Sequence, residues 1–129
     1  MDRINKGSDI HDREQFLKPM LDTVLKVARR GGRVIAGTDA PVNPFAISFH
    51  AELQSYVDAG LSPFEVLQTA TTAAADALGA GKDLGSIEPG KLADLVFVDG
   101  NPLADIKNAR KVRRVMKNGE FYRMDELLK

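Results

Sequence analysis

The fold is decided by the stretch Arg33-Val34-Ile35-Ala36-Gly37-Thr38-Asp39-Ala40-Pro41. Small and branched apolar residues lead into Gly37-Thr38-Asp39, and a helical pattern lies on either side, which predicts a buried strand that ends in a carboxylate. Parallel α/β folds place their chemistry at the C-terminal ends of such strands. Asp39 is therefore the first functional candidate. An aspartate here can also simply turn the chain, and the tripeptide itself does not separate these two interpretations.

Two predicted helices flank this strand. From Glu14 onward, apolar residues recur every three or four positions, at Leu17, Leu21, Val24, Leu25 and Ala28. Gly31-Gly32 supplies a stop before the strand. Beyond the Asp39 loop, residues 47–60 carry a second helical pattern that ends in glycine. Helix, glycine stop, strand and helix together predict a unit of a parallel α/β sheet.

A third helix begins at the clearest local signal in the chain. Ser62 is a predicted N-cap, Pro63 stands at the first helical position, and Glu65 completes a capping box. A short alanine-rich helix is predicted over residues 73–78 and ends at Gly79.

Beyond Gly81 the pattern changes to short strands and turns. Residues 93–98 predict a strand, and residues 112–116 and 120–122 predict two more around Asn118-Gly119, which favours a two-residue hairpin turn. Lys91 and Asp94 are expected to hold this β unit together. The C-terminal third is therefore predicted to be a small β domain.

Composition excludes several classes of partner. The chain has 129 residues, which is enough for one domain, and 18 Lys plus Arg balance 18 Asp plus Glu. A net charge of zero favours neither nucleic acid nor an anionic membrane, and no apolar run is long enough to span a bilayer. There are no cysteines, which excludes disulfides and thiolate sites. The default expectation is a soluble cytoplasmic protein.

Several motifs resemble the amidohydrolase superfamily. They are "VIAGTDA" at residues 34–40, His50-Ala51-Glu52-Leu53, and "LGSIEPGKLADLVFVDGNPL" at residues 84–103. The imidazolonepropionase and prolidase-like branch is the most similar. The resemblance implies α/β architecture: a flexible lead-in over 1–13, the C-terminal part of a (β/α)8 barrel over 14–80, and a small β-sandwich segment over 81–129.

The resemblance also implies a role for Asp39. In the family, an aspartate at this position contacts a divalent metal, with zinc the expected ion. It takes a proton from the attacking water and passes it to the leaving amine. The implied function is hydrolysis of amide or other carbon–nitrogen bonds, dipeptides included. Asp39 is thus predicted to be both the catalytic and the metal-binding residue of this chain.

Most of the family's other metal ligands have no counterpart here. The only histidines are His11 in the polar lead-in and His50 on a predicted helix, and neither matches a ligand position. The chain thus resembles a C-terminal fragment and is expected to be inactive alone, with no metal of its own as one possibility. Unpaired strand edges predict a homo-oligomer or a complementary chain. The alternative is a non-catalytic interaction or folding module derived from such an enzyme.

A nucleic-acid patch is a further interpretation of the basic residues at 107, 110, 111, 113, 114 and 117. They alternate with apolar residues such as Val112 and Val115, as on the solvated side of a strand, and no aromatic platform accompanies them. The sequence favours the strand.

Overall fold

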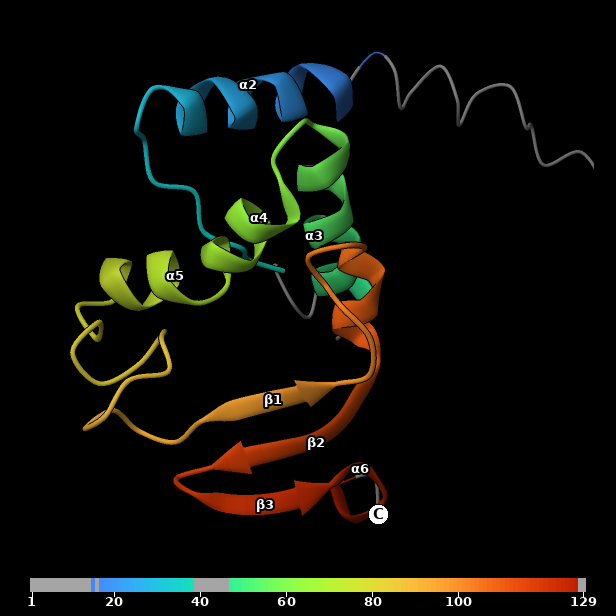
Figure 1. The fold of residues 1–129 in the computed structure, drawn as a ribbon. Helices are drawn as coiled ribbons and strands as arrows, with labels where there is room; N and C mark the ends of the chain where they lie inside the picture. Colours follow the sequence, from blue (N-terminus) through green and yellow to red (C-terminus); the bar gives the residue numbers. More distant parts are fainter. Residues whose placement is uncertain (1–14, 16, 39–46, 128–129) are drawn as a thin grey trace, which may run out of the picture.

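The structure, a computed structural model, describes residue 15 and residues 17–38 and 47–127, so the predicted lead-in over 1–13 lies outside the described residues. Helices α2 to α5 occupy the first part of the described chain, and a small sheet with η2 and α6 occupies the last (Figure 1). In order, the elements are α2 (Lys18–Arg29), α3 (Ile47–Asp58), α4 (Pro63–Thr69), α5 (Thr72–Ala77), β1 (Leu95–Val98), the 3-10 helix η2 (Ile106–Arg110), β2 (Val112–Lys117), β3 (Glu120–Arg123) and α6 (Met124–Leu127).

The predicted helices are confirmed, with their signals in place. Pro19 lies in the first turn of α2, and Gly31 takes the left-handed conformation, with φ of 77°, just after the helix ends. The capping box at α4 is complete, because the Ser62 hydroxyl accepts from the Glu65 backbone N–H while the Glu65 carboxylate accepts from the Ser62 backbone N–H at 2.7 Å. These local signals fix where the helices begin and end.

The core lies where α3 and α4 meet η2. Its buried residues are Leu53, Tyr56, Leu61, Val66 and Ile106. Val24, Leu25 and Ala28 of α2 pack against this cluster, as their spacing predicts. Since Ile106 belongs to η2, the core also ties the β part of the chain to the helices.

The prediction of a sheet strand that ends at Asp39 is wrong for residues 33–38, because this segment forms no β-ladder with described residues. The segment runs past the core without joining any sheet that the structure describes. A strand needs a neighbour for its backbone groups, and here the Ala36 N–H instead donates to the Thr69 carbonyl at 3.1 Å. Val34 and Ala36 pack on the core while Ile35 is 47 % exposed, so the alternation of a half-buried strand persists without the ladder.

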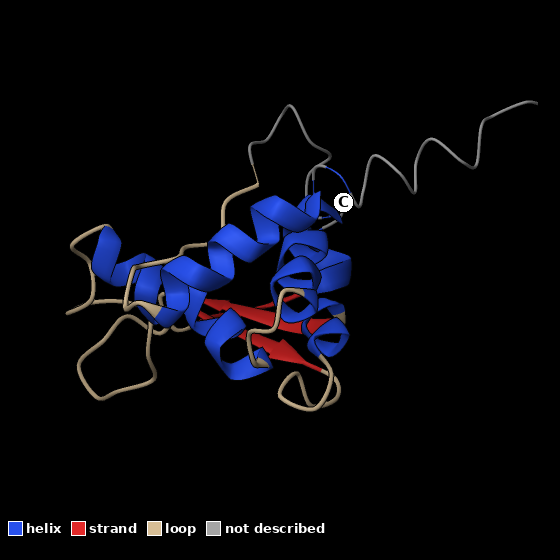
Figure 2. Cartoon of the chain, turned by 90° about the horizontal axis from the view of Figure 1, so that it is seen from above, coloured by secondary structure: helices blue, strands red, loops and turns tan. Residues whose placement is uncertain are grey.

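The predicted β unit is a three-stranded antiparallel sheet in the order β1-β2-β3. Viewed from above, its strands lie beneath the helices (Figure 2). Asn118 and Gly119 have φ of 52° and 84°, which is the turn predicted between β2 and β3. Asp94 accepts from the Asn118 N–H at 2.8 Å and pairs with Lys117, so it braces the hairpin as expected.

Candidate functional site

Asp39, the predicted catalytic and metal-binding residue, lies outside the described residues, as does His11. The structure does describe the segment that leads into Asp39. Side chains of α3 hold this segment through hydrogen bonds to residues 35 and 37. The site is therefore built from the residues that hold positions 35–37 in place.

Two side chains of α3 hold this segment. The Glu52 carboxylate accepts from the Gly37 backbone N–H at 2.9 Å and from the Tyr56 hydroxyl at 2.6 Å. The Tyr56 hydroxyl also lies 3.4 Å from the Ile35 carbonyl oxygen. Residues four apart on a helix share a face, so Glu52 and Tyr56 act on the segment together.

The chemistry of Tyr56 suits this role. Its side chain is only 8 % exposed and belongs to the core cluster. Burial, together with the Glu52 carboxylate, raises the pKa of Tyr56 well above its usual range. The phenol therefore remains protonated and donates at any physiological pH. Sequence reasoning missed this pair, although the four-residue spacing of Glu52 and Tyr56 could have suggested it.

His50 is not part of a metal cluster in the described chain. Its ring packs edge-on against Phe49, with centroids 5.4 Å apart. Burial and the nearby Arg110 guanidinium lower the pKa of His50, which favours the neutral imidazole. Among the residues that the structure describes, no group of three or more His, Cys, Asp or Glu side chains could hold a metal ion. The described residues do not by themselves fit a metal centre.

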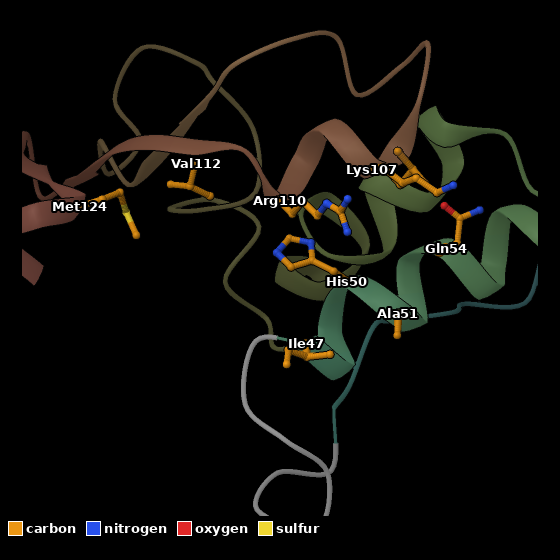
Figure 3. Close-up of a pocket in the computed structure, with 9 residues that line it drawn as sticks. Ile47, His50, Ala51, Gln54, Lys107, Arg110, Val112 and Met124 are labelled. Atoms are coloured by element: carbon orange, nitrogen blue, oxygen red, sulfur yellow. The ribbon is translucent and has the colours of Figure 1, made fainter. Parts of the chain in front are cut away.

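His50 instead lines a groove of about 580 Å³ between α3 and η2, which we call the α3–η2 groove (Figure 3). Its apolar lining comes from Ile47, Ala51, Ile106, Val112 and Met124. Arg110 and Lys107 project into the same space from η2. The groove thus combines an apolar wall with basic groups.

Comparison with known proteins identifies the family. The sequence profile described as "Amidohydrolase family" matches residues 1–121. Because this match covers nearly the whole chain, the chain belongs to the amidohydrolase family, and the predicted superfamily is confirmed.

Individual relatives agree with this assignment. An ochratoxinase from Aspergillus niger is 35% identical over 117 residues, which are 83% of this chain and 24% of that protein. An imidazolonepropionase from Shouchella clausii is 44% identical over 64 residues, or 47% of this chain and 14% of that protein. A Xaa-Pro dipeptidase, crystallised with methionine in its active site, matches with a TM-score of 0.75 and 38% identity over 80% of this chain and 25% of that chain.

The chain therefore spans about a quarter of the length of the ochratoxinase and the dipeptidase. The predicted α/β class agrees with these structural neighbours, whereas the finer predictions, a barrel segment and a β-sandwich, remain predictions. No helix within the described residues is long and apolar enough to cross a membrane.

Proposed function

We propose that this chain supplies the C-terminal part of an amidohydrolase that hydrolyses amide or related carbon–nitrogen bonds, dipeptides included. The observation that carries the proposal is the attachment of residues 35–37 to α3. Glu52 fixes the Gly37 N–H two residues before Asp39. A catalytic group needs support from rigid elements, and a segment held by α3 two residues before Asp39 supports this proposal.

Asp39 is the proposed catalytic residue. It accepts a proton from the attacking water and delivers it to the nitrogen of the leaving amine, which is general base and then general acid catalysis. A divalent metal, with zinc the expected ion, would activate the water, and Asp39 would be one of its ligands. Since the described residues hold no metal cluster, any further ligands come from outside them.

The chain is proposed to work in association with a copy of itself or with a complementary chain. Ile35 is 47 % exposed and Ile47 is 73 % exposed, one on each side of the Asp39 loop in the sequence. The segment over 33–37 joins no sheet among the described residues. Exposed apolar side chains favour association.

The test measures mass, metal and activity on one sample. The purified chain is incubated with excess zinc and analysed by light scattering and by elemental analysis, then assayed on N-acyl amino acids and dipeptides. Asp39→Asn removes the proposed base and ligand. Asp58→Asn is the matched control, because Asp58 is an exposed carboxylate on α3 that accepts only from Gln54 among the described contacts.

If copies of the chain complete the site, the sample is an oligomer that holds zinc and hydrolyses at least one substrate, with both properties lost in Asp39→Asn and kept in Asp58→Asn. If a complementary chain is required, the chain alone stays inactive, as the sequence predicts. An oligomer of this chain that stays metal-free and inactive in excess zinc overturns completion of the site by its own copies.

The second candidate is a non-catalytic interaction or folding module derived from an amidohydrolase. Exposed apolar side chains of the sheet, such as Phe97 and Phe121, favour it because they suit an interaction surface. In that case the chain associates just as strongly when Asp39 is replaced, and light scattering of Asp39→Asn gives an unchanged mass with no bound zinc in either protein.

A further inference from the structure

The turn between β2 and β3 carries the one asparagine of this sequence that is followed by glycine. Asn118 and Gly119 are both exposed, and they lie at the end of the sheet where β1 begins (Figure 1). Both have positive φ, which is why this pair suits a two-residue hairpin turn. The pair is also chemically labile, because glycine has no side chain to hinder attack of its backbone nitrogen on the asparagine side chain.

Deamidation of this pair consumes only water. The Gly119 nitrogen bonds to the side-chain carbonyl carbon Cγ of Asn118, the Cγ–Nδ2 bond breaks, and the proton of the Gly119 nitrogen leaves with the ammonia. A cyclic succinimide remains. Water then opens the ring at either carbonyl, which gives aspartate or isoaspartate, and nothing is oxidised or reduced. The nucleophile is thus a backbone nitrogen, and the hydrogen bond that this nitrogen makes affects its reactivity.

The structure docks this turn on the residues that precede β1. The Gly119 N–H donates to the Ala93 carbonyl at 3.1 Å, and the Asn118 N–H donates to the Asp94 carboxylate at 2.8 Å. Lys117, the residue before the turn, pairs with the same carboxylate. A carbonyl oxygen is too weak a base to remove the proton that it accepts. The attacking nitrogen is therefore held in an unreactive arrangement, and Asp94 helps to hold it there.

We propose that Asn118 is a site of spontaneous deamidation and that docking of its turn on Ala93 and Asp94 keeps it unmodified in the native fold. Modification follows local opening of the hairpin, because the Gly119 nitrogen must leave the Ala93 carbonyl before it bonds to Cγ. Isoaspartate lengthens the backbone by a methylene group and so disrupts the turn that pairs β2 with β3. The inference goes beyond the proposed function, because neither Asp39 nor a metal takes part.

The test follows deamidation of the full chain at mildly alkaline pH by mass spectrometry. After the reaction is stopped in mild acid, peptide mapping locates the modified residue, and chromatography separates the aspartate and isoaspartate forms. The same chain in concentrated guanidinium chloride gives the rate without the fold. We expect Asn118 to react at least about tenfold faster in denaturant, because the native turn is held by two hydrogen bonds, one of them to a charged group.

Asp94→Ala tests the contribution of docking. It frees the Asn118 N–H and the Lys117 ammonium together, so the native rate should rise about tenfold while the rate in denaturant stays that of the parent chain. Asp94→Asn keeps an oxygen acceptor without the charge, and its native rate should lie between the two. Asp99→Ala is the matched control, because Asp99 is an exposed carboxylate after the other end of β1 that pairs with Arg113. It should leave the native rate unchanged.

Three results would overturn the proposal. The first is an Asn118 that stays unmodified even in denaturant, since the site would then not be labile. The second is equal rates in the native and the unfolded chain, which would leave no role for docking. The third is a native rate in Asp99→Ala as high as that in Asp94→Ala, because it would show a general loss of stability without a specific restraint on the turn.

Discussion

Removing the Glu52 carboxylate should release the segment that leads to Asp39. Glu52→Ala deletes the acceptor for the Gly37 N–H at 2.9 Å and for the Tyr56 hydroxyl at 2.6 Å. A hydrogen bond to a charged group contributes about 1.5–3 kcal/mol. Gly37 is exposed, so in the variant water partly replaces the lost hydrogen bond of its N–H. The Tyr56 hydroxyl still has the Ile35 carbonyl oxygen, 3.4 Å away, as an acceptor. The expected loss in the free energy of unfolding is therefore about 2 kcal/mol in total, below the sum of two full bonds.

Urea denaturation followed by circular dichroism measures this loss, and amide hydrogen exchange locates it. Protection of the Gly37 amide should fall about tenfold or more in Glu52→Ala. Tyr56→Phe keeps the buried ring and should cost about 1 kcal/mol. The double variant should lose less than the sum of the two, because the residues share a hydrogen bond.

Asp58→Ala is the matched control for Glu52→Ala, since it removes a carboxylate from the same helix without touching residues 33–38. Gly37 exchange should be unchanged in this variant. The reasoning fails if Glu52→Ala leaves Gly37 protection intact, or if Asp58→Ala lowers it to the same extent.

Two further predictions concern the framework around the site. Hydrogen bonds from the Ser62 backbone N–H and hydroxyl, together with Arg29, lower the pKa of Glu65 to about 2. The stability that ionised Glu65 contributes is therefore complete above its unfolded pKa near 4.5 and is lost as the pH falls toward 2. Urea titrations between pH 5 and 2 should show a shallower loss of stability in Glu65→Gln than in the parent chain. Gly85→Ala should cost about 3 kcal/mol, because the backbone is at φ +94° and a new Cβ would lie 2.7 Å from the Ala75 Cβ. Gly119→Ala, at φ +84° with open space around it, should cost only about 1 kcal/mol, and thermal unfolding of the two variants would contradict this ranking if their losses were equal.

The elements that the sequence predicts correctly are those fixed by local chemistry. The capping box of Ser62 and Glu65 and the Asn118-Gly119 turn each depend on residues within a few positions of one another. The helical spacing in α2 is likewise local. Such features need no knowledge of the rest of the molecule, and the structure reproduces them.

The segment over residues 33–38 shows where local reasoning stops. Its alternation of Val34 and Ala36 inward with Ile35 outward is present in the sequence, but a ladder depends on strands from elsewhere. The described chain offers it the Thr69 carbonyl and the Glu52 carboxylate instead. A strand pattern is therefore a more reliable predictor of which side chains are buried than of which strands pair.

The candidate site itself stays a prediction, because Asp39, which motif resemblance singles out, lies outside the described residues. Resemblance gives His50 no ligand position, and the structure places its ring against Phe49. The role of Glu52 depends on how α3 meets the segment over residues 33–37. That packing is a tertiary property, which is why the sequence does not assign this role to Glu52.

Both faces of the three-stranded sheet carry exposed apolar side chains. On the sheet, the ring centroids of Phe97 and Phe121 lie 5.5 Å apart, yet these residues are 39 % and 55 % exposed. Val96, which precedes Phe97 in β1, is 61 % exposed. Adjacent residues of a strand point to opposite faces, so both faces of the sheet carry exposed apolar side chains. A sheet with one solvated face would expose them on one side only. Among the described residues, neither face is covered completely. The same polypeptide thus leaves apolar surface uncovered in its sheet and at Ile35, in the segment that leads toward Asp39.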